Sequence, residues 1–125
     1  MTQSEEGDWI GVGDATRLAE GSALGARPGG HPIAVFRQGG QLFATDSLCT
    51  HAFVPLEDGL LEGFEIECPV HQARFDIRTG ACTAFPARFP LRTFPVREKA
   101  DVLEVRIPRN LPLARHLIAK SMPRA

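Results

Sequence analysis

Two short segments, Cys49-Thr50-His51 and Cys68-Pro69-Val70-His71, decide the fold and the chemistry expected of this chain. Each segment pairs one thiolate donor with one imidazole donor, and sixteen residues separate His51 from Cys68. Thiolate and imidazole are the ligands of zinc sites and of certain iron–sulfur clusters. The two segments therefore predict one metal centre with four ligands: Cys49, His51, Cys68 and His71.

The order of these ligands distinguishes between the two kinds of centre. Zinc sites commonly bring like ligands together, as C-x₂₋₄-C and H-x₃₋₅-H pairs that converge on one ion. Here each segment mixes a Cys with a His, and only Thr50 separates the first pair. In a [2Fe–2S] cluster with two His ligands, both imidazoles bind the same iron, so each mixed segment reaches both irons. The pattern favours one such cluster, with a zinc-stabilised binding module as the alternative.

Mixed ligation predicts a role in electron transfer. The oxidised two-iron, two-sulfide core carries two formal positive charges, which two thiolates cancel and four would overcompensate. Adding an electron to a neutral site in a low-dielectric pocket costs less than adding it to an anionic one, so the imidazoles raise the reduction potential. We therefore expect the rest of the chain to hold, tune and dock a one-electron centre.

The bulk properties narrow the class of protein further. A chain of 125 residues is long enough for one domain with a core of its own. A net charge of −1 argues against nucleic acid or an anionic membrane as partner, and no run of eighteen apolar residues predicts a membrane span. Three cysteines, two of them beside histidines, fit a reducing cytoplasm better than a disulfide framework.

Charge is unevenly distributed along the chain. Residues 49–82 hold six acids and two bases, whereas residues 83–125 hold three acids and nine bases. The acids near the ligands suggest a negative rim that steers the protein toward basic surfaces of its partners, or simply a solvated loop face. The residues of this rim are Glu57, Asp58, Glu62, Glu65 and Glu67.

Short apolar runs separated by Gly, Pro and Asp predict an all-β fold, a small antiparallel sandwich or barrel. Residues 8–12 read as a first strand, and residues 32–37 and 41–45 as a hairpin around the Gly39-Gly40 turn. Residues 91–97 and 102–107 predict a second hairpin. The ligand segments then lie in an excursion between strands, at about residues 46–88.

The predicted domain spans residues 1–108, and residues 109–125 form a C-terminal extension. In the extension, Leu113, Leu117 and Ile118 have helical spacing. A partly ordered tail or a single helix packed on the sheet is the simpler interpretation, and a contact with a partner or a second copy is the alternative.

Residues 41–86, with CTH and CPVHQARFDIRTG, resemble the Rieske-type ferredoxins of bacterial aromatic-ring-hydroxylating dioxygenase systems. The resemblance extends more weakly over about residues 8–107 and implies the Rieske iron–sulfur fold. It also implies that Cys49 and Cys68 bind the inner iron of one [2Fe–2S] cluster, while His51 and His71 bind the outer iron.

The resemblance carries two further expectations about the surroundings of the cluster. Pro86 resembles the proline of the loop that covers the cluster in this family, although an ordinary turn proline is the alternative. A glycine commonly follows the first-segment His in these ferredoxins, whereas this chain has Ala52 and then Phe53.

The resemblance implies a cytoplasmic carrier that takes electrons from a flavin-dependent, NAD(P)H-dependent ferredoxin reductase and passes them to a terminal oxygenase. The carrier itself would touch no organic substrate, and a ferredoxin for an oxygenase of a non-aromatic substrate is the alternative. An oxygenase would need a second iron held by two His and a carboxylate. Once four ligands are assigned, only His31 and His116 remain, so we expect a carrier and not an enzyme.

Residues beside the ligands refine the expected potential. Val70, Ala73 and Phe75 bear no hydroxyl that could donate to the cluster sulfurs, so the reduced cluster is less stabilised. We expect a potential on the order of −150 mV, at the low end of the Rieske range. Of the other residues, Cys82 reads as a small buried hydrophobe, and Arg74 and Asp76 as a local salt bridge.

Overall fold

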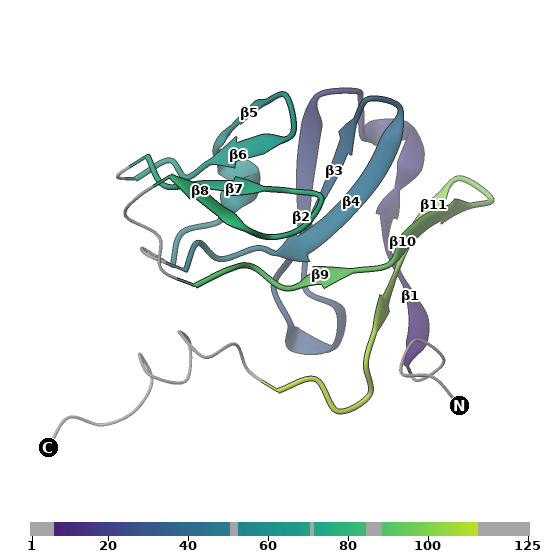
Figure 1. Ribbon diagram of the computed structural model, residues 1–125. Coiled ribbons are helices and arrows are strands. Elements are labelled where there is room, and N and C mark those ends of the chain that lie inside the picture. Colours follow the sequence, from purple (N-terminus) through teal and green to yellow (C-terminus); the bar gives the residue numbers. More distant parts are fainter. Residues whose placement is uncertain (1–6, 51–52, 71, 85–88, 113–125) are drawn as a thin grey trace, which may run out of the picture.

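Three antiparallel sheets make up the described part of the chain (Figure 1). The computed structural model describes residues 7–50, 53–70, 72–84 and 89–112. The strands are β1 (Asp8–Asp14), β2 (Ser22–Ala26), β3 (Ile33–Gln38), β4 (Gln41–Asp46), β5 (Leu60–Glu62), β6 (Glu65–Glu67), β7 (Arg74–Asp76), β8 (Cys82–Ala84), β9 (Thr93–Phe94), β10 (Val96–Lys99) and β11 (Val102–Ile107). Three 3₁₀ turns join them: η2 (Ala15–Arg17), η3 (Pro28–Gly30) and η4 (Leu56–Asp58). The predicted all-β class is confirmed.

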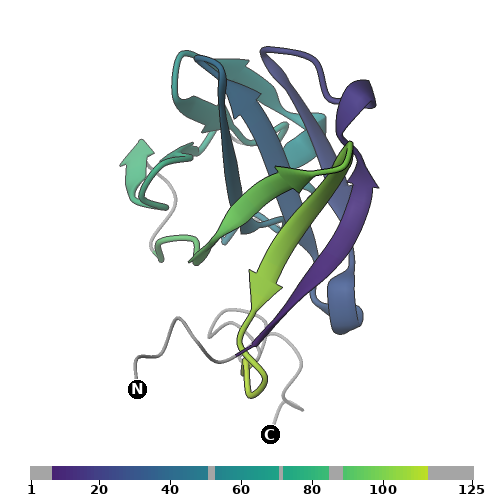
Figure 2. The same cartoon turned by 90° about the vertical axis from the view of Figure 1, so that its right-hand side faces the viewer.

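The sheet β2-β3-β4-β9 lies in the middle of the molecule. The small sheet β5-β6-β7-β8 lies on one side of it, and the sheet β1-β11-β10 lies on the other (Figure 1). Figure 2 views the molecule from the side of β1, β10 and β11, with the small sheet behind. None of the helical turns in the described ranges has the length and apolar character needed to cross a bilayer.

Strand β3 is buried on both faces and belongs to two cores. Side chains alternate along a strand, so neighbouring residues point to opposite faces of the sheet. Ala34 and Phe36 pack toward the small sheet, whereas Ile33 and Val35 pack toward β11, and all four are fully buried. We call the first group the centre-side core, with Cys49, Leu56, Ile66, Cys68, Ala73, Phe75, Ile77 and Leu91. We call the second the distal core, with Ala15, Leu18, Ala44, Phe94, Leu103, Val105 and Ile107.

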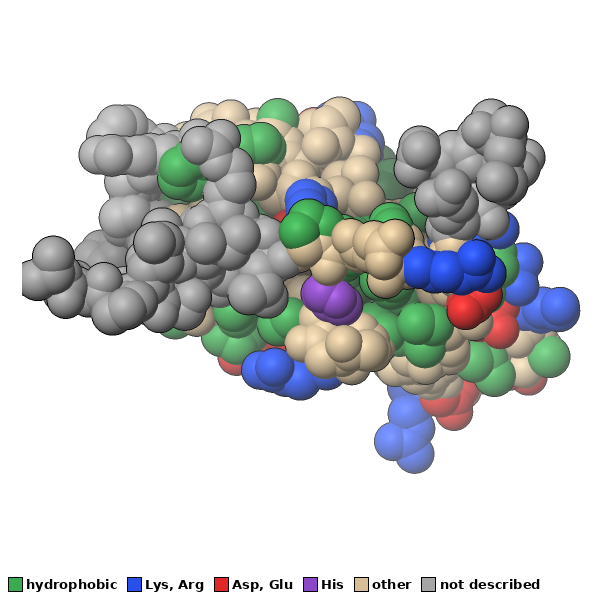
Figure 3. Space-filling model, turned by 90° about the horizontal axis from the view of Figure 1, so that it is seen from below, with side chains coloured by type: hydrophobic (Ala, Val, Ile, Leu, Met, Phe, Trp, Pro, Cys, Tyr) green, Lys and Arg blue, Asp and Glu red, His purple; other side chains and the backbone are tan. Residues whose placement is uncertain are grey.

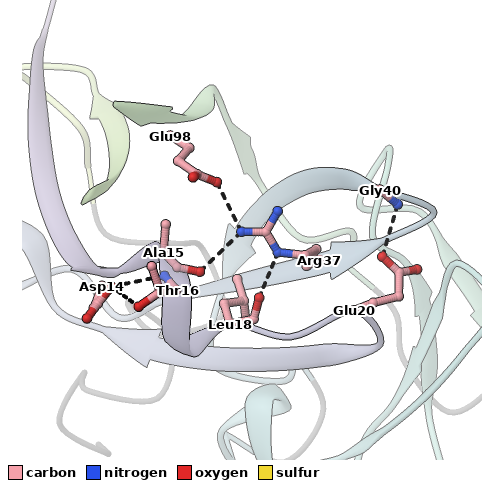
Figure 4. A network of polar contacts seen from close by, with 8 residues as sticks. All are labelled: Asp14, Ala15, Thr16, Leu18, Glu20, Arg37, Gly40 and Glu98. Atoms are coloured by element: carbon pink, nitrogen blue, oxygen red, sulfur yellow. Dashed lines mark hydrogen bonds and ion pairs between the residues drawn. The ribbon is translucent and has the colours of Figure 1, made fainter. Parts of the chain in front are cut away.

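The hairpin predicted around Gly39-Gly40 is present. Both glycines have positive φ, 64° and 73°, as a tight two-residue hairpin turn requires, and Gln38 pairs with Gln41 across it. The Glu20 carboxylate accepts the backbone N–H groups of both glycines, and Figure 4 shows its bond to Gly40. The turn is therefore held by an acidic side chain from the preceding loop.

Arg37 joins the middle sheet to the segments that cover its edge (Figure 4). Its guanidinium donates to the carbonyl oxygens of Leu18 and Ala15, at 2.7 and 3.3 Å. It also pairs with Glu98 of β10 at 3.2 Å. These contacts satisfy carbonyls of the η2 turn and fix the turn against the distal core.

The second predicted hairpin, residues 91–97 with 102–107, is correct only from Val96 onward. Strand β10 pairs with β11, and Leu103, Val105 and Ile107 alternate into the distal core as predicted. The run 91–97, however, divides at Pro95, which has no N–H for a ladder. The part before Pro95 becomes β9 and pairs with β4 in the middle sheet instead.

Candidate metal centre

The first ligand segment is a narrow loop that follows β4 directly. Leu48 and Pro55 form a β-bridge at its base. Inside the loop, the Cys49 N–H donates to the Val54 carbonyl, and the Phe53 N–H donates back to the Cys49 carbonyl, both at 2.9 Å. These bonds turn the Cys49 side chain inward, where it is fully buried. His51 lies in this loop but outside the described residues.

The departure after the first-segment histidine has a conformational consequence. Phe53 has a φ of 57°, in the left-handed region that glycine adopts most easily. Ala52, where the resembling ferredoxins commonly have glycine, lies outside the described residues. Phe53 is therefore a bulky residue in a backbone conformation that glycine adopts most easily.

The second ligand segment is the tip of the β6–β7 hairpin. Glu67 pairs with Arg74 at the ends of the strands, and the Cys68 N–H donates to the Ala73 carbonyl at 2.7 Å. Gln72 turns the chain with a φ of 60°. Cys68 is buried in the same core as Cys49, while His71 lies outside the described residues.

The two thiols share one apolar environment and act on each other. Burial, and to a lesser degree the neighbouring Cys49, raises the pKa of Cys68 to about 11, although the Val70 N–H donates to its sulfur and opposes the rise. Two thiolates in such a place need a positive partner, which a metal centre supplies. Within the described ranges no metal-binding group of three or more Cys, His, Asp or Glu is formed, and the predicted ligands His51 and His71 lie outside these ranges.

The surroundings of the two thiols are apolar, as the sequence indicated. Ala73 and Phe75 are fully buried against them, and Val70 is 38% exposed at the hairpin tip. These side chains bring no hydroxyl donor toward the sulfurs. Cys49 and Cys68 would hold a cluster through two thiolates, and their apolar surroundings fit such a group.

Comparisons with known proteins agree with this geometry. Residues 8–95 match the family described as the Rieske [2Fe-2S] domain. The chain belongs to the Rieske [2Fe–2S] family. Its cofactor is one Rieske-type [2Fe–2S] cluster, so the predicted resemblance and cofactor are confirmed.

Individual relatives identify the branch of the Rieske family. The chain is 41% identical over 97 residues to the ferredoxin component of the naphthalene 1,2-dioxygenase/salicylate 5-hydroxylase systems of Ralstonia sp, covering 78% of this chain and 89% of the relative. It is 45% identical over 91 residues to the ferredoxin component of the p-cumate 2,3-dioxygenase system of Pseudomonas putida, covering 71% and 77%. These relatives confirm the prediction of an electron-transfer component that is not itself an enzyme.

A solved structure shows the same fold. The chain superposes on one from the complex of reduced oxygenase and oxidized ferredoxin in carbazole 1,9a-dioxygenase, with a TM-score of 0.74 and 35% sequence identity. The match covers 83% of this chain and 97% of the other. The predicted Rieske ferredoxin fold is therefore confirmed.

The third cysteine of this Rieske domain lies nearer the centre than the sequence indicated. Cys82 packs against the centre-side core and is partly buried, as expected of a small hydrophobe. Its thiol also donates to the Phe89 carbonyl at 3.1 Å. Burial raises the pKa of the Cys82 thiol, and charge on Cys49 adds to the rise, which places Cys82 within electrostatic reach of a predicted ligand.

Ion pairs beside the Rieske centre differ from the predicted ones. The Arg74 guanidinium pairs with Glu62, Glu65 and Glu67, at 3.1, 3.4 and 2.7 Å, and not with Asp76. Asp76 instead pairs with Arg78 at 3.0 Å, and that guanidinium lowers the pKa of the Asp76 carboxyl. The predicted Arg74–Asp76 bridge is wrong because neighbouring strands place three other carboxylates around Arg74.

Part of the predicted acidic rim is consequently neutralised. Three of its five carboxylates share Arg74, and a fourth, Glu57, accepts the Ser47 hydroxyl at 2.7 Å. On the underside of the molecule, acidic and basic side chains of the described residues lie next to one another (Figure 3). Steering by the rim stays a prediction, with less unpaired charge than the sequence suggested.

Asp46, three residues before Cys49, forms an ion pair with Arg92. The sequence did not reveal this contact. Asp46 ends β4, its side chain is only 9% exposed, and it pairs with Arg92 at 3.0 Å. The same carboxylate accepts the Arg92 backbone N–H at 2.8 Å. Arg92 also donates to the Pro112 carbonyl and so reaches the start of the C-terminal extension.

Proposed function

We propose that Cys49, His51, Cys68 and His71 bind the two irons of the cluster. The observation that carries this proposal is the meeting of Cys49 and Cys68 in one buried apolar pocket. In each segment a histidine follows the cysteine within three residues. Bound there, the cluster accepts and releases one electron at a time.

The chain's own residues give the centre its properties. The two loop backbones orient the thiolates inward, and the Val70 N–H stabilises charge on the Cys68 sulfur. Phe75 and Ala73 keep water from the buried side. With few donors near the sulfurs, the expected reduction potential is on the order of −150 mV, and a redox titration giving a value well above zero would contradict this explanation.

We also propose the place of the chain in a multicomponent system. It accepts electrons from a flavin-dependent, NAD(P)H-dependent ferredoxin reductase in the cytoplasm and passes them to the terminal oxygenase of an aromatic-ring-hydroxylating dioxygenase system. The names of the relatives support this role, as does the solved complex of an oxygenase with a ferredoxin. Residues 1–108 would form the carrier domain, in which the last strand ends at Ile107, and residues 109–125 an extension.

One preparation tests the ligand proposal. The full chain, purified without oxygen, is expected to be brown, to contain two irons and two acid-labile sulfides per chain, and to show a Rieske EPR signal on reduction. A colourless, zinc-loaded protein would overturn the proposal in favour of a zinc module.

Reconstitution tests the partners. Mixed with a reductase, NAD(P)H and a panel of terminal oxygenases, the chain is expected to support product formation by an oxygenase of aromatic substrates. Product formation with only an oxygenase of non-aromatic substrates would replace that assignment and leave the carrier role intact.

A further inference from the structure

Two side chains donate to a single carbonyl oxygen beside the centre. The Thr50 hydroxyl donates to the Phe89 carbonyl at 2.8 Å, and the Cys82 thiol donates to the same oxygen at 3.1 Å. A carbonyl oxygen has two lone pairs, so it can accept both bonds at once. The three residues form one polar junction, which we call the Phe89 junction.

The junction connects parts of the chain that are far apart in sequence. Thr50 lies between Cys49 and His51, the two proposed ligands of the first segment. Cys82 of β8 and Phe89 are seven residues apart, and the thiol–carbonyl bond joins them; we call this pair the base. The Thr50 bond then fixes this base to the first ligand segment.

Burial makes these bonds consequential. Thr50 is 7% exposed, and Cys82 packs against the centre-side core. Removing the Thr50 hydroxyl takes away a bond that joins the Phe89 carbonyl to the first ligand segment, which favours separation of these two parts of the chain. Opening would admit water to the side of the pocket on which Cys49 lies.

We propose that Thr50 and Cys82 are positioning residues: through the Phe89 carbonyl they hold Cys82 and Phe89 against the first ligand segment and thereby control how firmly the cluster is held and how far water reaches it. This inference rests on the proposed ligation by Cys49 and His51. Water stabilises the added negative charge of a reduced cluster, so a looser junction raises the reduction potential.

The experiment compares variants that remove a donor with variants that keep it. Thr50→Val and Cys82→Ala remove a donor, whereas Thr50→Ser retains the hydroxyl and Cys82→Ser replaces the thiol with a hydroxyl donor. Thr83→Val is the control, because it makes the same change at an exposed neighbouring position. For each full-length, cluster-loaded variant the measurements are the midpoint potential, the EPR spectrum, the melting temperature and the rate at which visible absorption is lost in excess chelator.

Thr50→Val is expected to lose its cluster about fivefold faster than the parent, the change that one ordinary hydrogen bond corresponds to. Its potential should rise, and Thr50→Ser should restore both values. Cys82→Ala should shift both in the same direction by less, because a thiol is a weak donor. The double variant Thr50→Val/Cys82→Ala should show more than the sum of the two effects, since in each single variant the other donor still bonds to the shared carbonyl.

Two results would overturn the inference. In the first, Thr50→Val and Thr50→Ser behave alike, or both match Thr83→Val, while the parent carries a normal cluster. In the second, the melting temperature falls but the potential and the EPR spectrum stay unchanged, which would make the junction merely structural. Failure of the ligand proposal itself looks different, because the parent chain would then contain no cluster.

Discussion

The two cores on either side of β3 have different compositions and serve different ends. The distal core is filled by aliphatic side chains and one phenylalanine, and it joins the middle sheet to β11. The centre-side core contains two cysteines, and polar contacts such as Asp46–Arg92 and the Phe89 junction connect the segments at its edge. One strand thus separates a region that supplies stability from a region that supplies a redox environment.

The largest effect is expected from a variant that removes a proposed ligand from the centre-side core and leaves the distal core unchanged. Cys68→Ser should abolish the visible absorption and the acid-labile sulfide, because an alcohol does not replace a thiolate at the inner iron. Cys82→Ser is the matched control and should keep the cluster. Iron and sulfide analysis measures both, and circular dichroism should show retained β structure in each. A fully loaded Cys68→Ser protein would contradict the ligand set.

The next prediction sharpens the contrast between the cores. Phe75 and Leu103 are each fully buried, one on either side of the middle sheet. Phe75→Ala and Leu103→Ala should each lower the free energy of unfolding by about 3 kcal/mol, through lost burial and the cavity left behind. Only Phe75→Ala should also shift the reduction potential, because only Phe75 packs beside the cysteines.

Chemical denaturation of the loaded proteins, followed by redox titration, separates the two outcomes. Leu103→Val provides a milder control on the distal side. Equal shifts of the potential in the two alanine variants would mean that the cores are not independent.

Sequence reasoning succeeded where a local signal was strong. Two strands were predicted correctly from the Gly39-Gly40 turn, and one from the alternation of Leu103, Val105 and Ile107. A turn and an alternating burial pattern both depend on residues that are neighbours in the sequence. It missed β2, in which Leu24 is the one large apolar residue, and β5 to β8, because three-residue strands are too short to show a period.

The same limit applies to the site. The motifs singled out Cys49 and Cys68 as predicted ligands, and the structure buries both in one core. The contacts that hold their loops could not, since Thr50 is 39 residues from Phe89 and Asp46 is 46 residues from Arg92. Such pairs are created by tertiary packing, and neither side chain has a distinctive local pattern.

A charge pair at the edge of the centre-side core gives the third prediction. Asp46→Asn preserves shape but removes the charge that pairs with Arg92, so the free energy of unfolding should fall by about 2 kcal/mol. Asp8→Asn is the control: Asp8 pairs with Arg109 at 3.4 Å, but with side chains 76% and 67% exposed. That change should have no measurable effect. Equal losses in the two variants would show that burial does not strengthen the Asp46 pair.

The smallest effect is expected in the β10–β11 turn, in the sheet beside the distal core. We compare this turn with the β3–β4 turn. Both hairpin turns need positive φ, but β3–β4 uses two glycines, whereas β10–β11 uses Ala100 and Asp101 at 52° and 66°. An alanine in this region costs about 1 kcal/mol, and asparagine tolerates it better. Ala100→Asn should therefore raise the free energy of unfolding by about 0.5 kcal/mol and leave the reduction potential unchanged.

The reverse change in the other turn should reach the centre-side core. Gly39→Ala would introduce the same backbone strain, and its Cβ would lie 3.1 Å from the ring of Phe64, which packs against that core. It should cost more than Ala100→Asn gains, because strain and crowding act together. Denaturation curves of the two variants compare the turns directly. If Ala100→Asn proved destabilising, the β10–β11 turn would have to depend on a contact of the Ala100 methyl group rather than on its backbone conformation.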